Sequence, residues 1–239
     1  MVTRSKAVAS SLALLMMLAI APASAFNLNK SIEIGDNSEA SGQSTVNGSI
    51  SVGSGARING SLETVNGTIR IEENATLEDA ETVNGSIRVA SGVQIADVES
   101  VNGSIRLAEN VTVNGEVTVV NGKISMKGGT SVADDVSNVN GEITLAGAEI
   151  GGDLSTVNGD ISLHDGATLH GDLTVEKPGG WGWKNRRKPK VIIGPDSKVL
   201  GRIVLEREVE LFIHDSAEVG GVTGEMSVDD AVRFSGDRP

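Results

Sequence analysis

Residues 82–99 read TVNGSIRVASGVQIADVE, and the triplet Val-Asn-Gly within this stretch returns along most of the chain. Successive asparagines of the series lie 18 or 19 residues apart. A fixed period of this size is typical of a solenoid, in which each repeat forms one coil stacked on the next. The recurring asparagines are Asn47, Asn66, Asn84, Asn102, Asn121, Asn140 and Asn158.

The apolar residues of one repeat divide it into three sides. Ile87 and Val89 form a pair spaced by two, as do Val93 and Ile95, and a gap of four separates the pairs. Pairs spaced by two indicate short strands with both side chains on one face, and the gaps indicate corners. We therefore predict an all-β, parallel, three-sided β-solenoid (β-helix) with about 18–19 residues per coil, in which Val83 also faces the core.

Asn-Gly is also a strong signal for a two-residue β-hairpin, which makes an antiparallel meander the alternative fold. In a hairpin at Asn84, Val83 and Ile87 would lie on opposite faces, so every repeat would expose one aliphatic residue. At a solenoid corner both can face the core. Glycine would then adopt a positive φ, and stacked asparagines about 4.8 Å apart would form a hydrogen-bonded ladder. The pattern favours the solenoid and a structural role for Asn-Gly.

Residues 1–25 have the organisation of a cleaved export signal. Arg4 and Lys6 precede the apolar stretch LALLMMLAI, and residues 23–25 (Ala-Ser-Ala) match a cleavage site. The alternative is an uncleaved membrane anchor, but the apolar stretch is short for a bilayer span and Pro22 interrupts it. We expect an exported protein, periplasmic, surface-located or secreted, in a Gram-negative bacterium, with no transmembrane span in the mature chain.

Composition limits the available chemistry. The chain has no cysteine, which excludes a disulfide framework, thiolate chemistry and a lipid anchor on cysteine. Removal of the signal would leave 18 basic and 32 acidic residues, and such an acidic chain is not suited to general nucleic-acid binding. Thirty glycines and five aromatic residues fit a turn-rich β protein better than a large globular core.

Three further segments precede or follow the repeats, apart from an insertion described below. Residues 26–44 contain an Ile-x-Ile pair without Val-Asn-Gly and are expected to form an N-terminal cap coil before the repeats at 45–176. Residues 191–225 resume the solenoid as two coils without Asn-Gly. The tail at 226–239 is expected to cover the last open edge, because an uncovered edge invites pairing with another chain.

A basic insertion at 177–190 separates the two parts of the solenoid. It combines six cations with both tryptophans and contains no acidic residue. Indoles beside a basic run can lie at a lipid interface while the cations meet phosphate groups, or the loop can hold an anionic glycan. The alternative is a solvated loop whose charges lie against the acidic body. The proposed anion- or membrane-binding residues are Lys177, Trp181, Trp183, Lys184, Arg186, Arg187, Lys188 and Lys190.

Two series of charged residues recur every 18 residues. They are Arg70, Arg88 and Arg106, and Glu63, Glu81 and Glu99. Like charges about 5 Å apart repel. We therefore expect the arginines either to lie beside acidic groups or to meet an anion.

The C-terminal coils resemble a known family. Residues 191–225 read VIIGPDSKVLGRIVLEREVELFIHDSAEVGGVTGE, which is similar to bactofilins, a polymer-forming bacterial cytoskeletal family. The Val-Asn-Gly-x-Ile stretches also resemble repeat-built bacterial adhesin domains. The bactofilin resemblance is best over 151–225 and implies a right-handed β-helix that associates end to end and has no catalytic residues. The export signal, the Asn-Gly corners and the basic loop depart from that family.

Three histidines support the alternative of a β-helix enzyme acting on glycans or acyl groups, because hexapeptide-repeat acyltransferases use a histidine base on a similar scaffold. This chain lacks an acceptor-binding insertion and the aromatic platforms of a sugar-cleaving cleft. His164 and His170 are one side apart rather than one coil apart, which does not suit a shared zinc site. Asn-Gly corners also lack the aspartates of calcium-binding β-rolls.

The sequence therefore predicts a non-enzymatic structural scaffold or adhesin-like module of the cell envelope, with no metal and no cofactor. The expected partners are further copies of the chain, as a homo-oligomer or end-to-end polymer, and an anionic envelope glycan or lipid. Nucleic acid is not among them.

Overall fold

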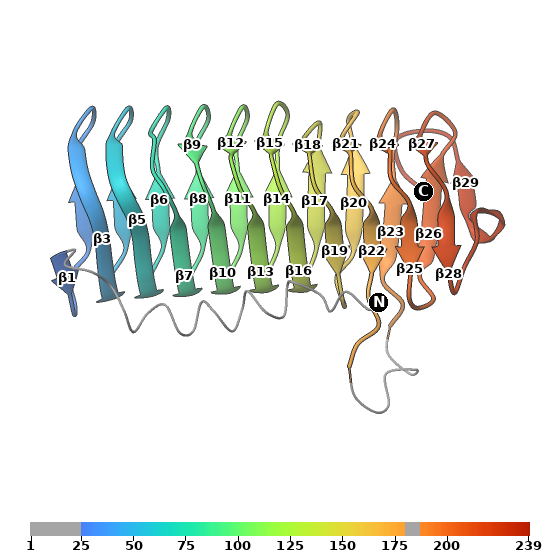
Figure 1. The fold of residues 1–239 in the computed structure, drawn as a ribbon, viewed down its shortest axis with the longest axis horizontal. Coiled ribbons are helices and arrows are strands. Elements are labelled where there is room, and N and C mark those ends of the chain that lie inside the picture. The colour runs from blue at the N-terminus through green and yellow to red at the C-terminus, as the bar shows by residue number, and fades with distance from the viewer. Residues whose placement is uncertain (1–24, 180–186) are drawn as a thin grey trace.

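The protein is a three-sided parallel β-solenoid in the computed structural model, which describes residues 25–179 and 187–239 (Figure 1). Each coil follows a strand of a first sheet, the Asn-Gly corner, a strand of a second sheet, a tight turn and a strand of a third sheet. Every described strand pair is parallel, as between β7 and β10. The predicted fold class is confirmed, and the antiparallel meander is wrong. The handedness stays a prediction.

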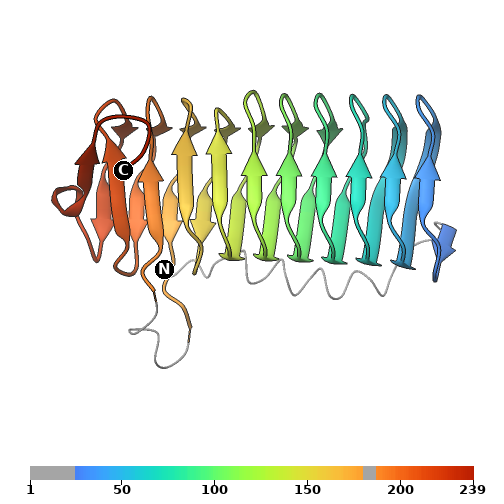
Figure 2. The same cartoon turned by 180° about the vertical axis from the view of Figure 1, so that it is seen from behind.

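Two long sheets form the opposite faces seen in Figures 1 and 2. Within the described ranges, the first sheet has eleven strands: β1 (Ala25–Asn27), β3 (Glu39–Asn47), β5 (Arg57–Asn66), β7 (Ala80–Asn84), β10 (Val98–Asn102), β13 (Val117–Asn121), β16 (Val136–Asn140), β19 (Leu154–Thr156), β22 (Leu173–Val175), β25 (Ile203–Leu205) and β28 (Val222–Gly224). The second sheet, counted over the same ranges, also has eleven: β2 (Ile32–Ile34), β4 (Ile50–Val52), β6 (Ile69–Ile71), β8 (Ile87–Val89), β11 (Ile105–Leu107), β14 (Ile124–Met126), β17 (Ile143–Ala146), β20 (Ile161–His164), β23 (Lys190–Ile193), β26 (Glu210–His214) and β29 (Val232–Phe234).

The third sheet closes the triangle with shorter strands. Over the described residues it has seven: β9 (Gln94–Ile95), β12 (Thr112–Val113), β15 (Ser131–Val132), β18 (Glu149–Ile150), β21 (Thr168–Leu169), β24 (Lys198–Val199) and β27 (Glu218–Val219). One 3-10 helix, η2 (Val228–Asp230), lies in the C-terminal tail.

Aliphatic residues from equivalent positions stack into continuous columns inside the solenoid. Ile87 is in register with Ile69 on one side and Ile105 on the other, and all three are fully buried. Burial of such a side chain contributes roughly 1.5–3 kcal/mol, so the columns supply the main stabilisation of the stack. The paired Ile and Val residues that define the repeat are therefore the core, as the sequence predicts.

The predicted inward orientation of Val83 is wrong. The valine of Val-Asn-Gly is only partly buried, whereas the residue before it faces the core, and Thr82 and Ser100 are each 1% exposed. Because the strand continues through the valine to the asparagine, side-chain alternation turns the valine outward. The hydroxyls of Thr82 and Ser100 donate to the carbonyl oxygens of Gly67 and Gly85 in the preceding coils, both over 3.3 Å. Polar side chains thus occupy most of the inside of this corner, although Val119 interrupts the column and the buried Oδ1 of Asn138 has no hydrogen-bond partner.

Among the described residues, nothing covers the N-terminal end of the solenoid. β1 and β2 are the terminal strands of their sheets, so one edge of each has no partner strand among the described residues. Ile32 and Ile34 contact the core yet remain only partly buried, and Leu28 is 63% exposed. The N-terminal cap coil therefore extends the stack without sealing it.

The C-terminal end carries a lid made from the tail. Met226 and Ala231 pack against the core, and the Met226 sulfur accepts a hydrogen bond from the Val209 N–H over 3.3 Å. β29 then adds to β26 as the last strand of the second sheet. The two ends are therefore structurally different.

Candidate functional site

The Asn-Gly corners form one continuous chain of side-chain amides along the rod. In each pair of neighbouring coils the Nδ2 of one asparagine donates to the Oδ1 of the asparagine before it, over 2.8–3.1 Å. The pairs join Asn29, Asn47, Asn66, Asn84, Asn102, Asn121, Asn140 and Asn158. The amide groups are thereby satisfied by one another, which is a structural use of this corner.

The corner glycines are required for a reason other than the one predicted. Only Gly141 among them has a positive φ, 131°. A Cβ on Gly85 would overlap the carbonyl oxygen of Gly67 in the coil before it, and each of the other corner glycines has the same conflict with the residue stacked beneath it. Positive φ occurs instead at the turn after the second sheet, where Asn74 (59°) and Gly92 (73°) take equivalent places.

The amide ladder begins one coil earlier than the Val-Asn-Gly motif. Asn47 donates to Asn29 Oδ1 over 2.8 Å. A sequence signal was present, because Leu28-Asn29-Lys30 lies 18 residues before Val46-Asn47-Gly48. Lys30 stands in place of the corner glycine, so a search for Val-Asn-Gly does not find this coil.

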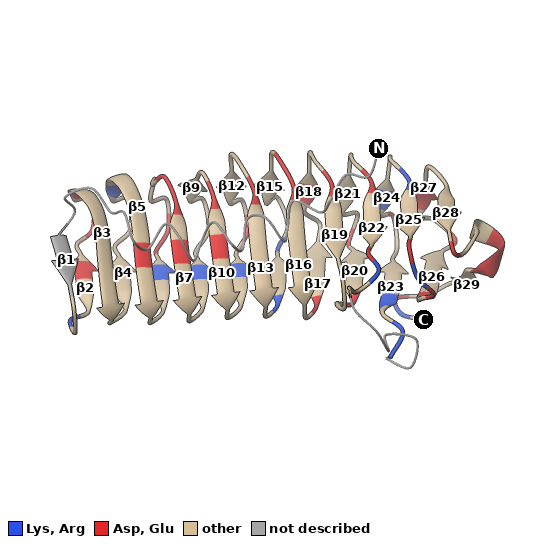
Figure 3. Cartoon of the chain, turned by 60° about the horizontal axis from the view of Figure 1, so that its bottom comes forward, with Lys and Arg blue, Asp and Glu red and all other residues tan. Residues whose placement is uncertain are grey.

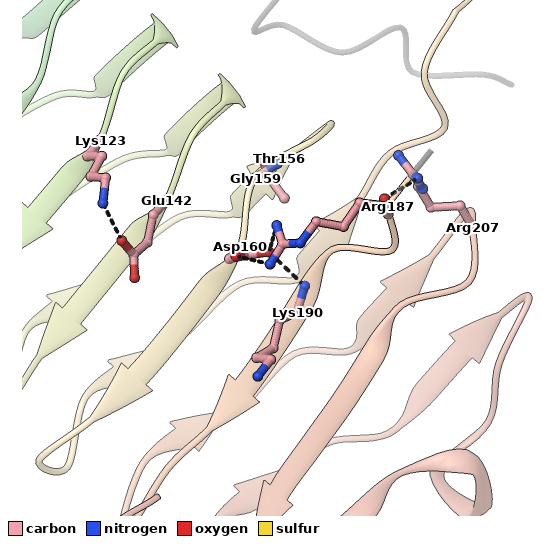
Figure 4. Close-up of polar contacts among 8 residues, drawn as sticks. All are labelled: Lys123, Glu142, Thr156, Gly159, Asp160, Arg187, Lys190 and Arg207. Carbon is pink, nitrogen blue, oxygen red and sulfur yellow. Dashed lines mark hydrogen bonds and ion pairs between the residues drawn. The ribbon is translucent and has the colours of Figure 1, made fainter. Parts of the chain in front are cut away.

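A buried arginine ends the ladder at the other side. The Arg207 guanidinium, in a residue that is only 4% exposed, donates to Asn158 Oδ1 over 3.2 Å and to the Val157 carbonyl over 3.3 Å. It also donates to the Arg187 carbonyl over 3.2 Å, which ties it to the returning end of the basic insertion (Figure 4). The coil after the insertion has no asparagine at this corner, and Arg207 supplies the donor for Asn158 Oδ1 in its place. Sequence spacing could not reveal this role, because 49 residues separate the partners and the period is broken between them.

Aspartates form a second ladder at the corner before the first sheet. Each Oδ1 accepts a hydrogen bond from a backbone N–H of the next coil, at 2.7–2.8 Å. The acceptors are Asp97, Asp135, Asp153 and Asp172. Much of the negative charge at this corner is therefore used to satisfy the backbone.

The base of the basic insertion is tied to the acidic body. Arg187 forms a bidentate pair with Asp160, at 3.0 and 2.7 Å, and the Lys190 N–H donates to the same carboxylate over 2.8 Å (Figure 4). Lys188 pairs with Glu208 at 2.6 Å, which lowers the pKa of that carboxyl. The Asp160 hydrogen bonds raise the pKa of Arg187 further.

Lys177 is the remaining member of the predicted anion-binding set that the structure describes. The Lys177 N–H donates to Glu206 Oε2 over 3.1 Å, where the chain leaves β22 for the insertion. Trp181, Trp183, Lys184 and Arg186 lie outside the described residues. The proposed contact with lipid or glycan through the loop stays a prediction.

The glutamate series forms a column on the first sheet. Glu81 is in register with Glu63 and Glu99, and all three are partly buried. Desolvation, with added repulsion from Glu63, Asp79 and Asp97, raises the pKa of Glu81 to about 7. Desolvation and then repulsion from Glu81 and Glu116 raise the pKa of Glu99 to about 8.

The histidines do not converge on one site. His164 at the end of β20 contacts Asp165 at 2.8 Å, and His170 after β21 contacts Glu149 at 2.7 Å. His214 at the end of β26 contacts the Ser216 hydroxyl at 2.8 Å. Each ring therefore has its own local partner.

Neither a metal-ligand cluster nor a membrane-spanning helix occurs in the part of the chain that the structure describes. Within residues 25–179 and 187–239, no group of three or more His, Asp or Glu side chains has a metal-binding arrangement. In that same part of the chain, no helix has the length and apolar character needed to cross a membrane. The predicted export signal lies outside the described residues except for Ala25, which begins β1.

Comparison with known proteins gives no family for the chain. No family model, curated protein or solved structure matches it. The structure itself shows a repeat protein with a parallel β-solenoid fold.

Proposed function

We propose that this protein is a non-enzymatic, exported structural module of the cell envelope, bactofilin-like in its solenoid and adhesin-like in its repeats. It acts as a stiff rod that associates through its N-terminal end. The basic loop then holds an anionic glycan or lipid of the envelope. Ten or so coils at the strand spacing make the rod roughly 45 Å long.

The difference between the two ends carries this proposal. The N-terminal end presents the free edges of β1 and β2 together with Leu28 and partly buried Ile32 and Ile34. An uncovered strand edge is a template for pairing with another chain. At the other end β27, β28 and β29 are also terminal strands, but Met226 and Ala231 of the tail pack against the core there. Two copies joined at their N-terminal ends would then form a closed pair instead of an endless filament.

The two side-chain ladders support a mechanical role. Asparagine amides bond successive coils from Asn29 to Asn158, and four aspartate carboxylates bond further pairs of coils at another corner, in addition to the backbone pairing of the sheets. Bending the rod would strain these bonds together. A rod in which most coils are bonded at their corners is suited to holding two attachment points apart.

Sedimentation velocity of residues 26–239 tests the association. We expect the fraction of dimer to rise with protein concentration. Leu28→Lys should shift the protein to monomer, because it places a charge on the exposed apolar end without touching the buried columns. Val232→Lys is the matched control, since Val232 is 54% exposed at the opposite end. A protein that stays monomeric at all concentrations, or an equal effect of both variants, would overturn the proposal.

Cell fractionation tests export and the loop separately. The N-terminal sequence of the mature protein should begin at Phe26. Replacing Trp181 and Trp183 by serine should release the rod from the envelope fraction while leaving its thermal unfolding unchanged, because Arg187 and Arg207 still anchor the loop base. An activity on glycans or acyl groups that disappears with His164→Ala or His214→Ala would favour the enzyme alternative.

A further inference from the structure

Three arginines form a column on the second sheet, away from the basic loop. Arg88 in β8 is in register with Arg70 in β6 and Arg106 in β11. All three side chains are exposed, and neighbouring strands are about 4.8 Å apart. In Figure 3 the cations and the carboxylates of this half of the rod follow neighbouring strands as separate bands.

The expected acidic partners of this column are missing. Within the described part of the chain, none of the three guanidinium groups forms an ion pair or a side-chain hydrogen bond. The glutamate column lies on the adjacent first sheet and makes no ion pair with it. A nearby cation behaves differently, since Lys127 pairs with Glu109 at 3.0 Å. The arginines therefore keep their donors available and repel one another.

The column borders a shallow hollow of about 270 Å³ on the surface. Its floor includes the edges of Val89 and Leu107 and the small side chains of Ala90 and Ala108. The small side chains of Ala90 and Ala108 leave a depression beside Arg88 and Arg106. Glu72 is the carboxylate at the N-terminal end of the hollow, where it lowers the positive charge beside Arg70.

We propose that this hollow binds a linear acidic polysaccharide that runs along the rod, with sugar carboxylates on the arginines. A guanidinium group matches a carboxylate through two parallel hydrogen bonds, and stacked arginines offer such forks at a regular spacing. The repulsion within the column is relieved when each arginine gains an anion. The site is distinct from the basic insertion and does not depend on the proposed function.

The chemistry of the hollow favours a glycan over denser polyanions. The apolar floor fits the C–H faces of sugar rings. Single-stranded nucleic acid needs aromatic platforms for its bases, and no aromatic side chain lines this hollow. The protein also has a net charge of −12, which repels a ligand with closely spaced charges such as polyphosphate.

Calorimetric titration with oligogalacturonate tests the proposal. Binding should weaken as salt is added, and Arg88→Gln should reduce the affinity at least about tenfold, because hydrogen bonds between charged groups are lost. In the arginine Nε–Hε spectrum of labelled protein, Arg88 should shift on titration. Arg57→Gln is the matched control, since Arg57 is exposed on a different side of the rod.

Comparison ligands separate the remaining outcomes. A neutral maltooligosaccharide should not bind, and tripolyphosphate should bind more weakly than oligogalacturonate. Stronger binding of tripolyphosphate, absence of oligogalacturonate binding, or equal losses in Arg88→Gln and Arg57→Gln would each overturn the proposal. Circular dichroism of both variants checks that the solenoid is intact.

Discussion

Charges are arranged differently in the two halves of the rod. In the N-terminal half, the arginine and glutamate columns stack like charges on like charges, as Arg88 does on Arg70 and Glu81 does on Glu63. These columns form no ion pairs, although Lys127 pairs with Glu109 one coil further along. In the C-terminal half, opposite charges face one another across coils. The pairs are Arg187–Asp160, Arg202–Asp172, Lys188–Glu208 and Lys198–Glu218.

This difference follows from how exactly the coils repeat. An identical residue every 18 positions is favourable for an isoleucine column or an amide ladder, because isoleucines pack against one another and amides form hydrogen bonds with one another. The same repetition is unfavourable for a charged residue. Coils that have diverged can place lysine over glutamate. The like-charge columns of the exact repeats are therefore a cost to stability, and a ligand is one reason to retain them.

The largest effect is expected at the corner glycines of the exact repeats. Gly85→Ala should lower the free energy of unfolding by about 3 kcal/mol, because the new Cβ would overlap the Gly67 carbonyl oxygen. Gly179→Ala, at a glycine with no heavy atom within 4 Å of such a Cβ, should change it by less than about 0.5 kcal/mol. Urea unfolding measures both. Equal values would show that coil stacking tolerates a side chain at this corner.

The next effect is expected where Arg207 ends the amide ladder. Arg207→Met should cost roughly 2–3 kcal/mol, because it leaves Asn158 Oδ1 and two backbone carbonyls without their donor. Arg202→Met is the control, since that arginine pairs with Asp172 at the surface and its loss should cost under about 1 kcal/mol. If the two variants unfolded alike, Arg207 would not be the terminus of the ladder.

The sequence predicts the strand pairs but not all the contacts between coils. The Ile87 and Val89 pattern is sufficient for the three-sided parallel fold, because burial of one face sets the phase of each strand. The orientation of Val83 was mispredicted because nothing local shows that the strand runs on to the asparagine. Arg207 and Asp97 could not be assigned, since their partners are set by stacking register and not by neighbouring residues.

The glutamate column should make stability depend on pH. The folded-state pKa of Glu99 is about 8, raised from 4.5, so its contribution to stability is fully present below pH 4.5 and is lost as pH rises towards 8. Glu99→Gln removes this loss. At pH 9 the variant should be more stable than the parent by roughly 1 kcal/mol, a value reduced for partial solvent exposure. At pH 4 the two should unfold alike, and a pH-independent difference would contradict the assignment.

The smallest effects separate the two charge arrangements directly. Arg88→Gln should raise the stability of the ligand-free protein by a few tenths of a kcal/mol, because it removes repulsion from Arg70 and Arg106. Glu218→Gln should lower it by a similar amount, because it breaks an exposed pair with Lys198. Both differences should vanish at about 1 M salt, where screening acts over about 3 Å. If the two changes in the free energy of unfolding have opposite signs at low salt and both vanish at high salt, the difference between the halves is electrostatic. It then follows from the repetition of charged residues and not from packing. A loss of stability in Arg88→Gln would instead mean that the arginine column contributes to folding, and would remove the argument that it is retained for a ligand.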